Sequence, residues 1–533
     1  MNEASQRGRR LRFNTISSLA NQMITVVCGI ILPRLILVTY GSEVNGLINS
    51  ITQFLQMISF LELGVGAVVQ ASLYKPLAKR DTVFVSQIMA SAQKFFSKLA
   101  RILLIYVVIL MIGYPFVAEQ DFGWVYTALM IAVISFSSFA QYFFGITNSL
   151  LLRADQRGYI QYILQLATVI LNTIACVVLI KLGAGIHVVK LTTSLIFVFR
   201  PIFLHRYVTK RYKINRRIKF QSEPIKQKWN GVAQHVAAVV LDGTDNIVLT
   251  VFSTLANVSI YSVYHLVIYG VKNLFLSLTN GMHSLIGELW AKQELDTLKD
   301  TFGRFEWILH TGTVFVFGCT GMLILPFISV YTSGITDVNY IQPLFAVLIT
   351  VANAGHCLRL PYSLMILAGG HFKQTQSNYI IAAIINVVLS VVLVISFGLV
   401  GVAIGTLAAM MYQTVWMAYY VSKNLIKWPF KNFLKQIGID TLSVVLSVAA
   451  SYWITMSSAN YLSWVVMAVK VALVWITVMV LINLIFYRRY VTEPALVIKE
   501  KIMKFTQKCG GVQTSNICEY SYANERRVYV CLG

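Results

Sequence analysis

The strongest constraint on this chain is a series of apolar stretches, each long enough to cross a lipid bilayer as a helix. A spanning helix needs about 20 predominantly apolar residues, and fourteen stretches meet this requirement. They lie at approximately residues 14–38, 45–73, 97–117, 124–150, 159–181, 185–204, 231–253, 259–287, 305–330, 340–367, 377–397, 400–421, 437–456 and 461–486. With 57% hydrophobic and only 12% charged residues, the chain lacks the polar surface of a soluble enzyme of this size. We therefore predict an all-α polytopic membrane protein.

The positions of the positive charges predict the orientation of these helices. The formal net charge is +23, but most Lys and Arg residues lie in short tracts between the apolar stretches, which indicates cytoplasmic loops rather than a nucleic-acid site. If the first helix starts in the cytoplasm behind Arg7, Arg9, Arg10 and Arg12, then 37 of the 44 Lys and Arg residues fall on the cytoplasmic side and only Lys181 falls in an outer loop. One missed or invented helix would invert every later loop, so the alternation favours fourteen spans with both termini in the cytoplasm.

The chain also matches itself weakly at a constant shift of 214 residues. Val44 corresponds to Val258, and Ile170-Leu171-Asn172 corresponds to Ile384-Ile385-Asn386. A repeat of six helices returns the chain to the same side of the membrane, so the two copies must be parallel, as in transporters that bind substrate between two lobes.

These patterns divide the chain into seven segments. We expect a basic cytoplasmic segment (1–12), an N-terminal six-helix lobe (13–204), a basic cytoplasmic linker (205–228), a C-terminal six-helix lobe (229–421), a basic cytoplasmic loop (422–436), helices 13 and 14 (437–487) and a disordered cytoplasmic tail (488–533).

Several charged residues fall inside the predicted spans. A charge at mid-bilayer costs about 2.5 to 3.5 kcal/mol, so seven such residues facing lipid would cost on the order of 20 kcal/mol, more than the stability of most domains. We therefore expect them to face one another or a wet cavity. They are Arg34, Glu62, Asp242, Asp245, Lys272, Arg359 and Lys470.

The three acidic residues are candidates for ion coupling or for structural ion pairs. Asp242 and Asp245 are three residues apart and share a helix face beside Gly243, where the chain can unwind or approach a neighbour closely. They would bind a proton or cation, or form a salt bridge, for example with Lys272. Glu62 has the same two interpretations.

The four cations, Arg34, Lys272, Arg359 and Lys470, outnumber the acids and favour an anionic substrate. The guanidinium of Arg binds phosphate through two parallel hydrogen bonds, while Lys supplies a point charge. Structural ion pairing competes with this interpretation, and Arg34 lies close enough to a helix end to extend to the membrane interface instead.

The sequence indicates no catalytic constellation, metal site or cofactor. The cysteine spacings fit neither a disulfide framework nor a zinc site. Four histidines near spans, His235, His265, His283 and His356, are more typical of hydrogen-bonded packing residues, so we leave them out of the predicted site.

Two regions of the chain resemble a known family. They are Tyr40-Gly41-Ser42-Glu43-Val44-Asn45-Gly46-Leu47, continuing through Phe60-Leu61-Glu62-Leu63-Gly64-Val65-Gly66 to Tyr74-Lys75-Pro76-Leu77-Ala78, and Thr244-Asp245-Asn246-Ile247-Val248-Leu249, ending in Val258-Ser259-Ile260-Tyr261-Ser262-Val263-Tyr264. The first resembles the second-helix region, and the second the seventh and eighth helices, of bacterial polysaccharide flippases of the O-antigen translocase type. The resemblance extends from the N-terminus to about residue 490.

This resemblance implies the fold of the multidrug and oligosaccharidyl-lipid exporter superfamily, with two six-helix lobes forming a V plus two extra helices. It implies a multi-pass protein of the bacterial cytoplasmic membrane that moves an undecaprenyl-diphosphate-linked oligosaccharide from the inner to the outer leaflet. The cavity cations, Arg34, Lys272, Arg359 and Lys470, would meet the diphosphate. Membrane lipids, H⁺ or Na⁺ and other membrane proteins of polysaccharide assembly are the expected partners, and nucleic acid is not.

Two other function classes predict different features. A proton- or sodium-coupled antiporter of drugs or cations on the same fold would need a predominantly acidic cavity, whereas the central charges here are mildly positive. A membrane glycan polymerase or ligase would need a sizeable outer loop to carry its reacting groups, whereas every predicted outer loop has about a dozen residues or fewer.

Overall fold

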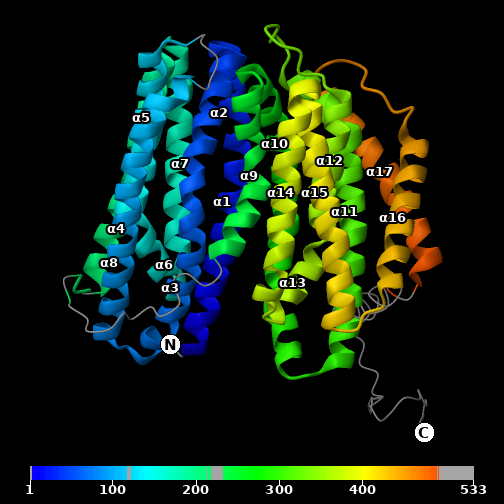
Figure 1. The fold of residues 1–533 in the computed structure, drawn as a ribbon, viewed down its shortest axis with the longest axis horizontal. Coiled ribbons are helices and arrows are strands. Elements are labelled where there is room, and N and C mark those ends of the chain that lie inside the picture. Colours follow the sequence, from blue (N-terminus) through cyan, green and yellow to red (C-terminus); the bar gives the residue numbers. More distant parts are fainter. Residues whose placement is uncertain are drawn as a thin grey trace, which may run out of the picture. The chain divides into compact units, whose positions relative to one another are not determined.

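The computed structural model describes residues 3–116, 122–212, 214–216, 218, 232–488 and 490 of the chain, and every element in this part is helical. Figure 1 shows the arrangement of these helices. The elements are α1 (Glu3–Tyr40), α2 (Ser42–Gln56), η1 (Met57–Ser59), α3 (Phe60–Lys79), α4 (Thr82–Gly113), η2 (Tyr114–Phe116), α5 (Trp124–Ala140), η3 (Gln141–Gly145), α6 (Ile146–Ala154), α7 (Gly158–Lys181), α8 (Ile186–Tyr212), α9 (Val232–Phe252), α10 (Leu255–Ala291), α11 (Leu295–Tyr331), α12 (Pro343–Leu358), α13 (Leu360–Ala368), α14 (Phe372–Phe397), α15 (Leu399–Asn424), α16 (Phe430–Ser451) and α17 (Tyr461–Phe486).

Eleven helical segments in the described part of the chain are long and apolar enough to cross a membrane. They coincide with eleven of the predicted stretches. The other three predicted stretches, 45–73, 231–253 and 259–287, overlap α2–α3, α9 and α10, which are not among these eleven and include residues outside the described part of the chain. The all-helical membrane fold is thus confirmed, while the count of fourteen spans stays a prediction.

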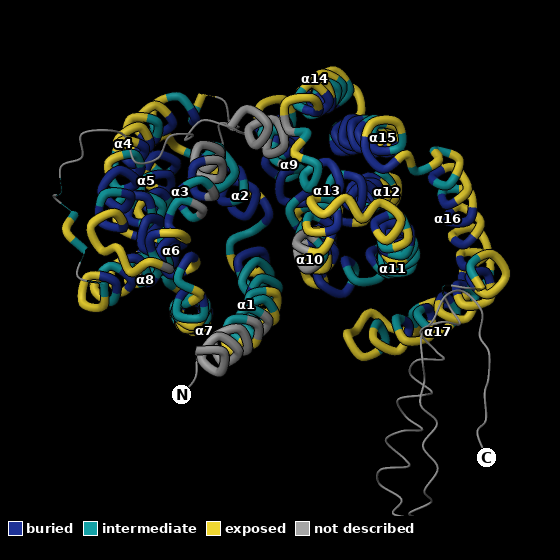
Figure 2. Tube along the Cα trace, turned by 90° about the horizontal axis from the view of Figure 1, so that it is seen from below, coloured by how far each residue is buried: buried dark blue, intermediate teal, exposed yellow. Residues whose placement is uncertain are grey.

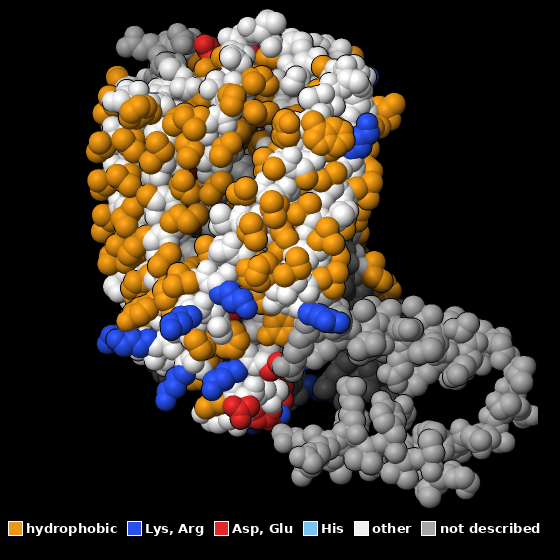
Figure 3. All heavy atoms as spheres, turned by 90° about the vertical axis from the view of Figure 1, so that its right-hand side faces the viewer, with side chains coloured by type: hydrophobic (Ala, Val, Ile, Leu, Met, Phe, Trp, Pro, Cys, Tyr) orange, Lys and Arg blue, Asp and Glu red, His pale blue; other side chains and the backbone are white. Residues whose placement is uncertain are grey.

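Large apolar side chains point outward along the helices, as expected for surfaces that face lipid rather than water. Ile395 on α14 and Leu462 on α17 are 73% and 76% exposed. Figure 3 shows hydrophobic side chains over most of one face and Lys and Arg side chains gathered towards its lower edge. This separation of apolar and basic bands is typical of a protein that crosses a bilayer.

The chain divides into two compact units, residues 1–476 and 477–533. The second unit contains the C-terminal part of α17, and its remaining described residues are Tyr487, Arg488 and Tyr490. Apart from the last two of these, the tail predicted at 488–533 lies outside the described residues.

The first unit holds two hydrophobic cores, each built by one group of helices (Figure 2). One core contains Leu47, Phe96 and Leu204 from the helices that precede α9. The other is dominated by residues of α9 to α16, including Phe302 and Tyr362. We refer to α1–α8 as the N-terminal lobe and to α9–α15 as the C-terminal lobe.

The two lobes repeat the same order of helices, which confirms the duplication. The first residues of α7 and α14, Gly158 and Phe372, are separated by the predicted shift of 214 residues, and so are the last residues of α6 and α13, Ala154 and Ala368. The interruption in the fourth helix of each lobe also recurs, at η3 and between α12 and α13.

The lobes meet where α2 packs against α10, the corresponding helix of the other repeat. Gly46 permits this approach, because a Cβ atom there would lie 1.9 Å from the carbonyl oxygen of Leu255. Asn45 donates a hydrogen bond from Nδ2 to Ser259 Oγ at 2.8 Å, and these residues are 214 positions apart. Equivalent positions touch each other only near a symmetry axis, so the axis that relates the two lobes passes close to this contact.

Within the C-terminal lobe, α15 packs tightly against α14, as the spacing of Gly401 and Gly405 predicts. A Cβ atom at Gly401 would lie 2.3 Å from the carbonyl oxygen of Leu393, and one at Gly405 would lie 2.3 Å from Ser390 Oγ. Any side chain at these positions would push the two helices apart.

We therefore expect Gly401→Ala to lower the free energy of unfolding by about 1–3 kcal/mol through overpacking. The matched control is Gly438→Ala on α16, where a Cβ atom would enter open space and better helix propensity should be neutral or stabilising. Thermal unfolding of both purified variants measures the difference. Equal midpoints for the two variants would contradict the tight contact between α14 and α15.

Candidate functional site

Two of the predicted cavity cations lie in the C-terminal lobe near the same histidine. Lys272 of α10 and Arg359 are each 6% exposed, and His356 of α12 is buried beside them. Arg359 donates from Nη2 to His356 Nδ1 at 2.8 Å, and Lys272 acts electrostatically on the same imidazole. A guanidinium has only N–H donors, so His356 accepts through Nδ1 and carries its proton on Nε2. We call Lys272, His356 and Arg359 the basic cluster.

The position of Arg359 follows from the break between α12 and α13. Pro361 stands in the first turn of α13, and a proline there has no N–H to continue the preceding helix. The repeat places η3, a π-helical turn ending at Gly145, at the equivalent point of the N-terminal lobe. Such interruptions recur at functional sites, and in the C-terminal lobe this one carries the Arg side chain.

Arg34 lies elsewhere, between α1 and the ends of α11 and α17. It donates to the carbonyl oxygen of Val330 at 3.1 Å and to the Tyr461 hydroxyl. Its guanidinium carbon lies 5.9 Å from the ring centre of Tyr331 and 5.4 Å from that of Tyr461, a geometry that attracts a cation to the ring faces. The described contacts of Arg34 are thus with phenol rings and a backbone carbonyl.

Lys470 is exposed on α17, in contrast to the two buried cations of the basic cluster. The structure therefore brings together Lys272 and Arg359 but not all four predicted cations. That any of the four contacts substrate stays a prediction.

Among the predicted acids, Asp245 occupies a buried polar site where four helices of the C-terminal lobe meet. Its carboxylate is 3% exposed and accepts hydrogen bonds from the hydroxyls of Tyr261 and Thr406, both at 2.9 Å, and from Asn386 Nδ2 at 3.5 Å. Thr244 donates to Asn386 Oδ1 at 2.7 Å. We call these five residues the Asp245 network.

The network offers only oxygen atoms and one amide nitrogen around a single carboxylate. This donor set suits a proton or a hard monovalent cation better than a soft metal. No group of three or more His, Cys, Asp or Glu side chains that could hold a metal ion occurs among the described residues. The side chains of Glu62 and Asp242 lie outside the described part of the chain, so their predicted roles stay predictions.

The sequence interpretation missed a second buried group of titratable residues, Glu306 and His310 on α11 and Asp440 on α16. They lie within six residues of the starts of the predicted spans 305–330 and 437–456, where charged residues are ordinary. The available signal was the spacing of Glu306 and His310, which places both side chains on one helix face.

The lobes are also joined by a polar network on the predicted outer side. Ser42 donates from its backbone nitrogen and from Oγ to the carboxylate of Asp337, at 2.7 and 2.8 Å, and the Tyr340 hydroxyl lies 2.6 Å from Ser42 Oγ and 2.9 Å from Ser259 Oγ.

Comparisons with known proteins identify the fold. No protein family model matches the chain, and no curated protein matches it in sequence. The lipid II flippase MurJ in an inward closed conformation superposes with a TM-score of 0.66 at 14% identity, covering 90% of this chain and 99% of MurJ. An inward-facing multidrug resistance MATE family transporter of the MOP superfamily superposes with a TM-score of 0.58 at 14% identity, covering 78% of this chain and 98% of the transporter.

A MOP superfamily transporter from Pyrococcus furiosus, described with a binding pocket of reversed polarity, superposes with a TM-score of 0.51 at 11% identity, covering 79% of this chain and 97% of that one. At these identities the likeness shows the fold alone. The chain therefore has the helical fold shared by MurJ and the MATE transporters, as the sequence resemblance implied.

The Asp245 network gives a direct test of the buried polar site. We expect Thr406→Val, which keeps the size of the side chain but removes its hydroxyl, to lower the free energy of unfolding by about 1–2 kcal/mol. The control is Thr192→Val on α8, whose hydroxyl is exposed and bonds the Val188 carbonyl of its own helix, with an expected change within about 0.5 kcal/mol. Chemical or thermal unfolding in detergent measures both, and an unchanged stability of Thr406→Val would show that its hydroxyl does not support Asp245.

Proposed function

We propose that this protein is a flippase that moves an undecaprenyl-diphosphate-linked oligosaccharide from the inner to the outer leaflet of the bacterial cytoplasmic membrane for surface polysaccharide assembly. The observation that carries the proposal is the basic cluster, a Lys and an Arg that are both buried and both adjacent to one imidazole. It occurs on a fold shared with a lipid II flippase, a protein named for a lipid-linked substrate. In this proposal the protein is a transporter and not an enzyme.

The basic cluster has the chemistry that a diphosphate requires. The Arg359 guanidinium offers two parallel N–H donors to one phosphate, and the Lys272 ammonium supplies a compact charge for the other. The low dielectric around these buried groups strengthens both interactions relative to water. His356, which accepts from Arg359, fixes the direction of the guanidinium, so the cation is oriented before a substrate arrives.

Alternating access is the mechanism that we propose for the movement. The contact between the lobes includes hydrogen bonds between neutral groups, such as Asn45 to Ser259 at 2.8 Å and Ser50 to Thr250 at 2.6 Å. Each such bond contributes about 0.5–1.5 kcal/mol net, because water replaces it when the groups separate. These neutral groups can therefore separate and meet again at low cost.

The membrane potential supplies a driving force for this substrate. The cell interior is negative, so outward movement of about two negative charges releases roughly 4–5 kcal/mol per 100 mV. Coupling to H⁺ or Na⁺ is therefore permitted but not required. Asp245 is the described carboxylate that we propose for such coupling, with Glu62 and Asp242 as the other candidates from the sequence.

A cation or drug antiporter on the same fold is the second candidate function. The Asp245 network favours it, because a buried carboxylate that accepts hydrogen bonds from hydroxyl and amide groups can also bind a cationic ligand. The two candidate functions differ in the ligand that they predict: a flippase binds a prenyl diphosphate at the basic cluster, whereas an antiporter does not. Binding of a lipophilic cation by the purified protein, with no effect of a prenyl diphosphate, would favour the antiporter.

The decisive experiment expresses the chain in bacterial cells that lack their own glycan flippase and measures the return of surface polysaccharide. We expect the wild type to restore export, and Lys272→Gln and Arg359→Gln each to reduce it at least about tenfold, the equivalent of one lost charged contact. Arg34→Gln and Lys470→Gln complete the test of the predicted set. The matched control is Lys373→Gln, which removes an exposed cation at the start of α14. Normal export in all four variants would refute the assignment of the binding site.

Ion coupling is tested by Asp245→Asn, which keeps the size of the side chain but removes its charge. We expect the variant to lose the dependence of flux on a proton or sodium gradient while the protein stays folded, because a neutral amide cannot take up and release a cation in each cycle. Transport into vesicles with imposed gradients measures this effect. Gradient dependence equal to that of the wild type would remove Asp245 from the mechanism.

A further inference from the structure

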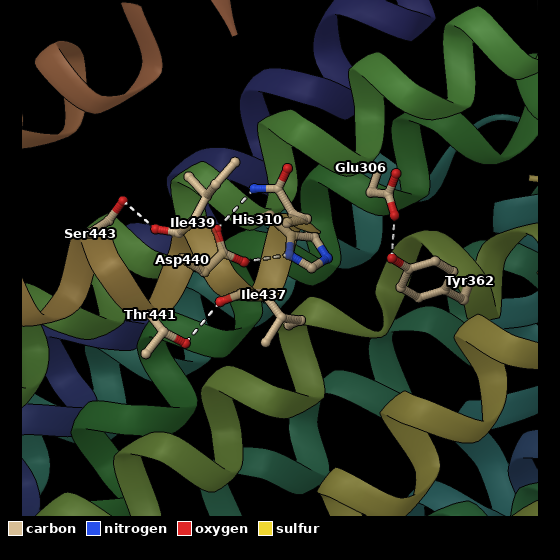
Figure 4. A network of polar contacts seen from close by, with 9 residues as sticks. Glu306, His310, Tyr362, Ile437, Ile439, Asp440, Thr441 and Ser443 are labelled. Atoms are coloured by element: carbon tan, nitrogen blue, oxygen red, sulfur yellow. Dashed lines mark hydrogen bonds and ion pairs between the residues drawn. The ribbon is translucent and has the colours of Figure 1, made fainter. Parts of the chain in front are cut away.

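Three titratable side chains outside the basic cluster and the Asp245 network lie together in the C-terminal lobe and its neighbour α16. Glu306 and His310 are one turn apart on α11, and Asp440 faces them from α16. Their exposed fractions are 4%, 0% and 6%. Figure 4 shows Asp440 and Glu306 on opposite sides of the His310 ring. We call these three residues the acid-imidazole site.

All four carboxylate oxygens of the acid-imidazole site accept a hydrogen bond. Asp440 accepts from His310 Nδ1 at 2.7 Å and from Gln436 Nε2 at 2.9 Å. Glu306 accepts from the Tyr362 hydroxyl and from Trp428 Nε1 at 2.9 Å. An ionised carboxylate only accepts hydrogen bonds, so each of these bonds favours the ionised form and offsets part of the cost of burying the charge.

The charge balance of the site then requires a proton. Since Asp440 accepts from Nδ1, this ring nitrogen of His310 carries a hydrogen, and Nε2 is the atom that gains or loses one. With Nε2 unprotonated, two buried carboxylates face a neutral ring. With Nε2 protonated, an imidazolium lies between them and offsets one of the two charges, which is the favourable arrangement in a low-dielectric interior.

The Nε2 proton also connects the site to the break between α12 and α13. His310 Nε2 is buried and has no hydrogen-bond partner among the described residues. The backbone carbonyl of Leu358 acts electrostatically on the same ring, and Leu358 is the last residue of α12, directly before Arg359. Protonated Nε2 has a hydrogen to donate to this carbonyl, whereas unprotonated Nε2 has none. The protonation state of His310 therefore acts on the backbone that positions Arg359.

The acid-imidazole site also contacts the loop between α15 and α16. Trp428 of this loop is half-buried and donates from Nε1 to Glu306, and its neighbour Lys427 is exposed. In the predicted topology this loop faces the cytoplasm. Glu306, one helical turn from His310, therefore joins the site to the cytoplasmic end of the lobe.

We propose that Glu306, His310 and Asp440 form a proton-binding site whose loading sets the position of the α12–α13 break and hence of Arg359. The binding of a proton at this site does not depend on the proposed flippase function. The effect of that proton on a diphosphate ligand at Arg359 does rest on the proposed function. The proton adds to His310 Nε2 from water and returns to water, so no other reactant is needed.

Other charged groups surround the site on the elements that pack against α11. Lys272 of α10 and His356 of α12 interact with each other within the basic cluster. From α16, Lys435 is present besides Asp440, and on α11 itself Arg304 forms an exposed ion pair with Asp300 at 3.0 Å. Tyr362 of α13 reaches the site through Glu306. The groups that act on His310 electrostatically are Asp440 and Glu306.

The test is an NMR titration of the full-length protein in nanodiscs with carbon-13 at Cε1 of its eight histidines. The signal that disappears in His310→Gln belongs to His310. We expect this signal to titrate in the wild type, and its midpoint to move down by about one pH unit or more in Asp440→Asn and in Glu306→Gln, because each removes one negative charge beside the ring. The control, Asp300→Asn, removes an exposed carboxylate of the same helix and should leave the midpoint in place.

The proposed proton site would be overturned if the His310 signal did not titrate in the folded protein, or if its titration midpoint were unchanged in both variants. If Asp440→Asn does not fold, Glu306→Gln alone decides the point, since Glu306 forms no described bond with His310. The link to Arg359 is tested by adding farnesyl diphosphate as a probe. We expect the probe to move the titration midpoint of His310 in the wild type but not in Arg359→Gln. An unmoved midpoint in the wild type would overturn the link to Arg359. The first titration, without the probe, would still test the proton site.

Discussion

The cost of placing charge in an apolar interior is the constraint on which the polar features of this structure depend. A charged side chain at mid-bilayer costs about 2.5–3.5 kcal/mol, so each one must find polar neighbours within the protein. The described contacts show three solutions. Arg359 donates to a neutral imidazole, Arg34 lies against two phenol rings, and Asp245 accepts from hydroxyl and amide groups. Each solution fixes one helix against another, so the charges also determine how the helices pack.

The internal duplication supplied the scaffold, but the charges of the basic cluster and of the Asp245 network belong to only one copy. The positions 214 residues before Asp245, Lys272 and Arg359 hold Ile31, Ile58 and Gly145. The N-terminal lobe thus repeats the helices and the interruption of the fourth helix without repeating the ionisable residues. In the proposed mechanism the two lobes move about the axis near Asn45 and Ser259, and the proposed binding chemistry belongs to one of them.

The C-terminal lobe places its three polar sites on connected elements. The basic cluster involves α10, α12 and the break that follows α12. The Asp245 network joins α9, α10, α14 and α15, and the acid-imidazole site joins α11 to α16. Helix α10 thus contributes to both the basic cluster and the Asp245 network. The α12–α13 break carries Arg359 of the basic cluster and, at Leu358, acts on His310 of the acid-imidazole site. A change of charge in one site has a direct structural path to the others through helices that pack in a hydrophobic core.

The sequence alone was sufficient for the features that depend on local composition. Membrane helices can be read from length and hydropathy because the bilayer sets the length of a helix, and the parallel repeat from the constant shift that Asn172 and Asn386 share. The sequence also identified Lys272, Arg359 and Asp245 as charged residues that must face other polar groups or water rather than lipid. Tertiary structure decided which of these charges meet, because contacts between residues far apart in the chain leave no local pattern. Only the fold could bring Asp440 to His310, 130 residues away, bring Lys272 and Arg359 near the same buried His356, and leave Lys470 exposed.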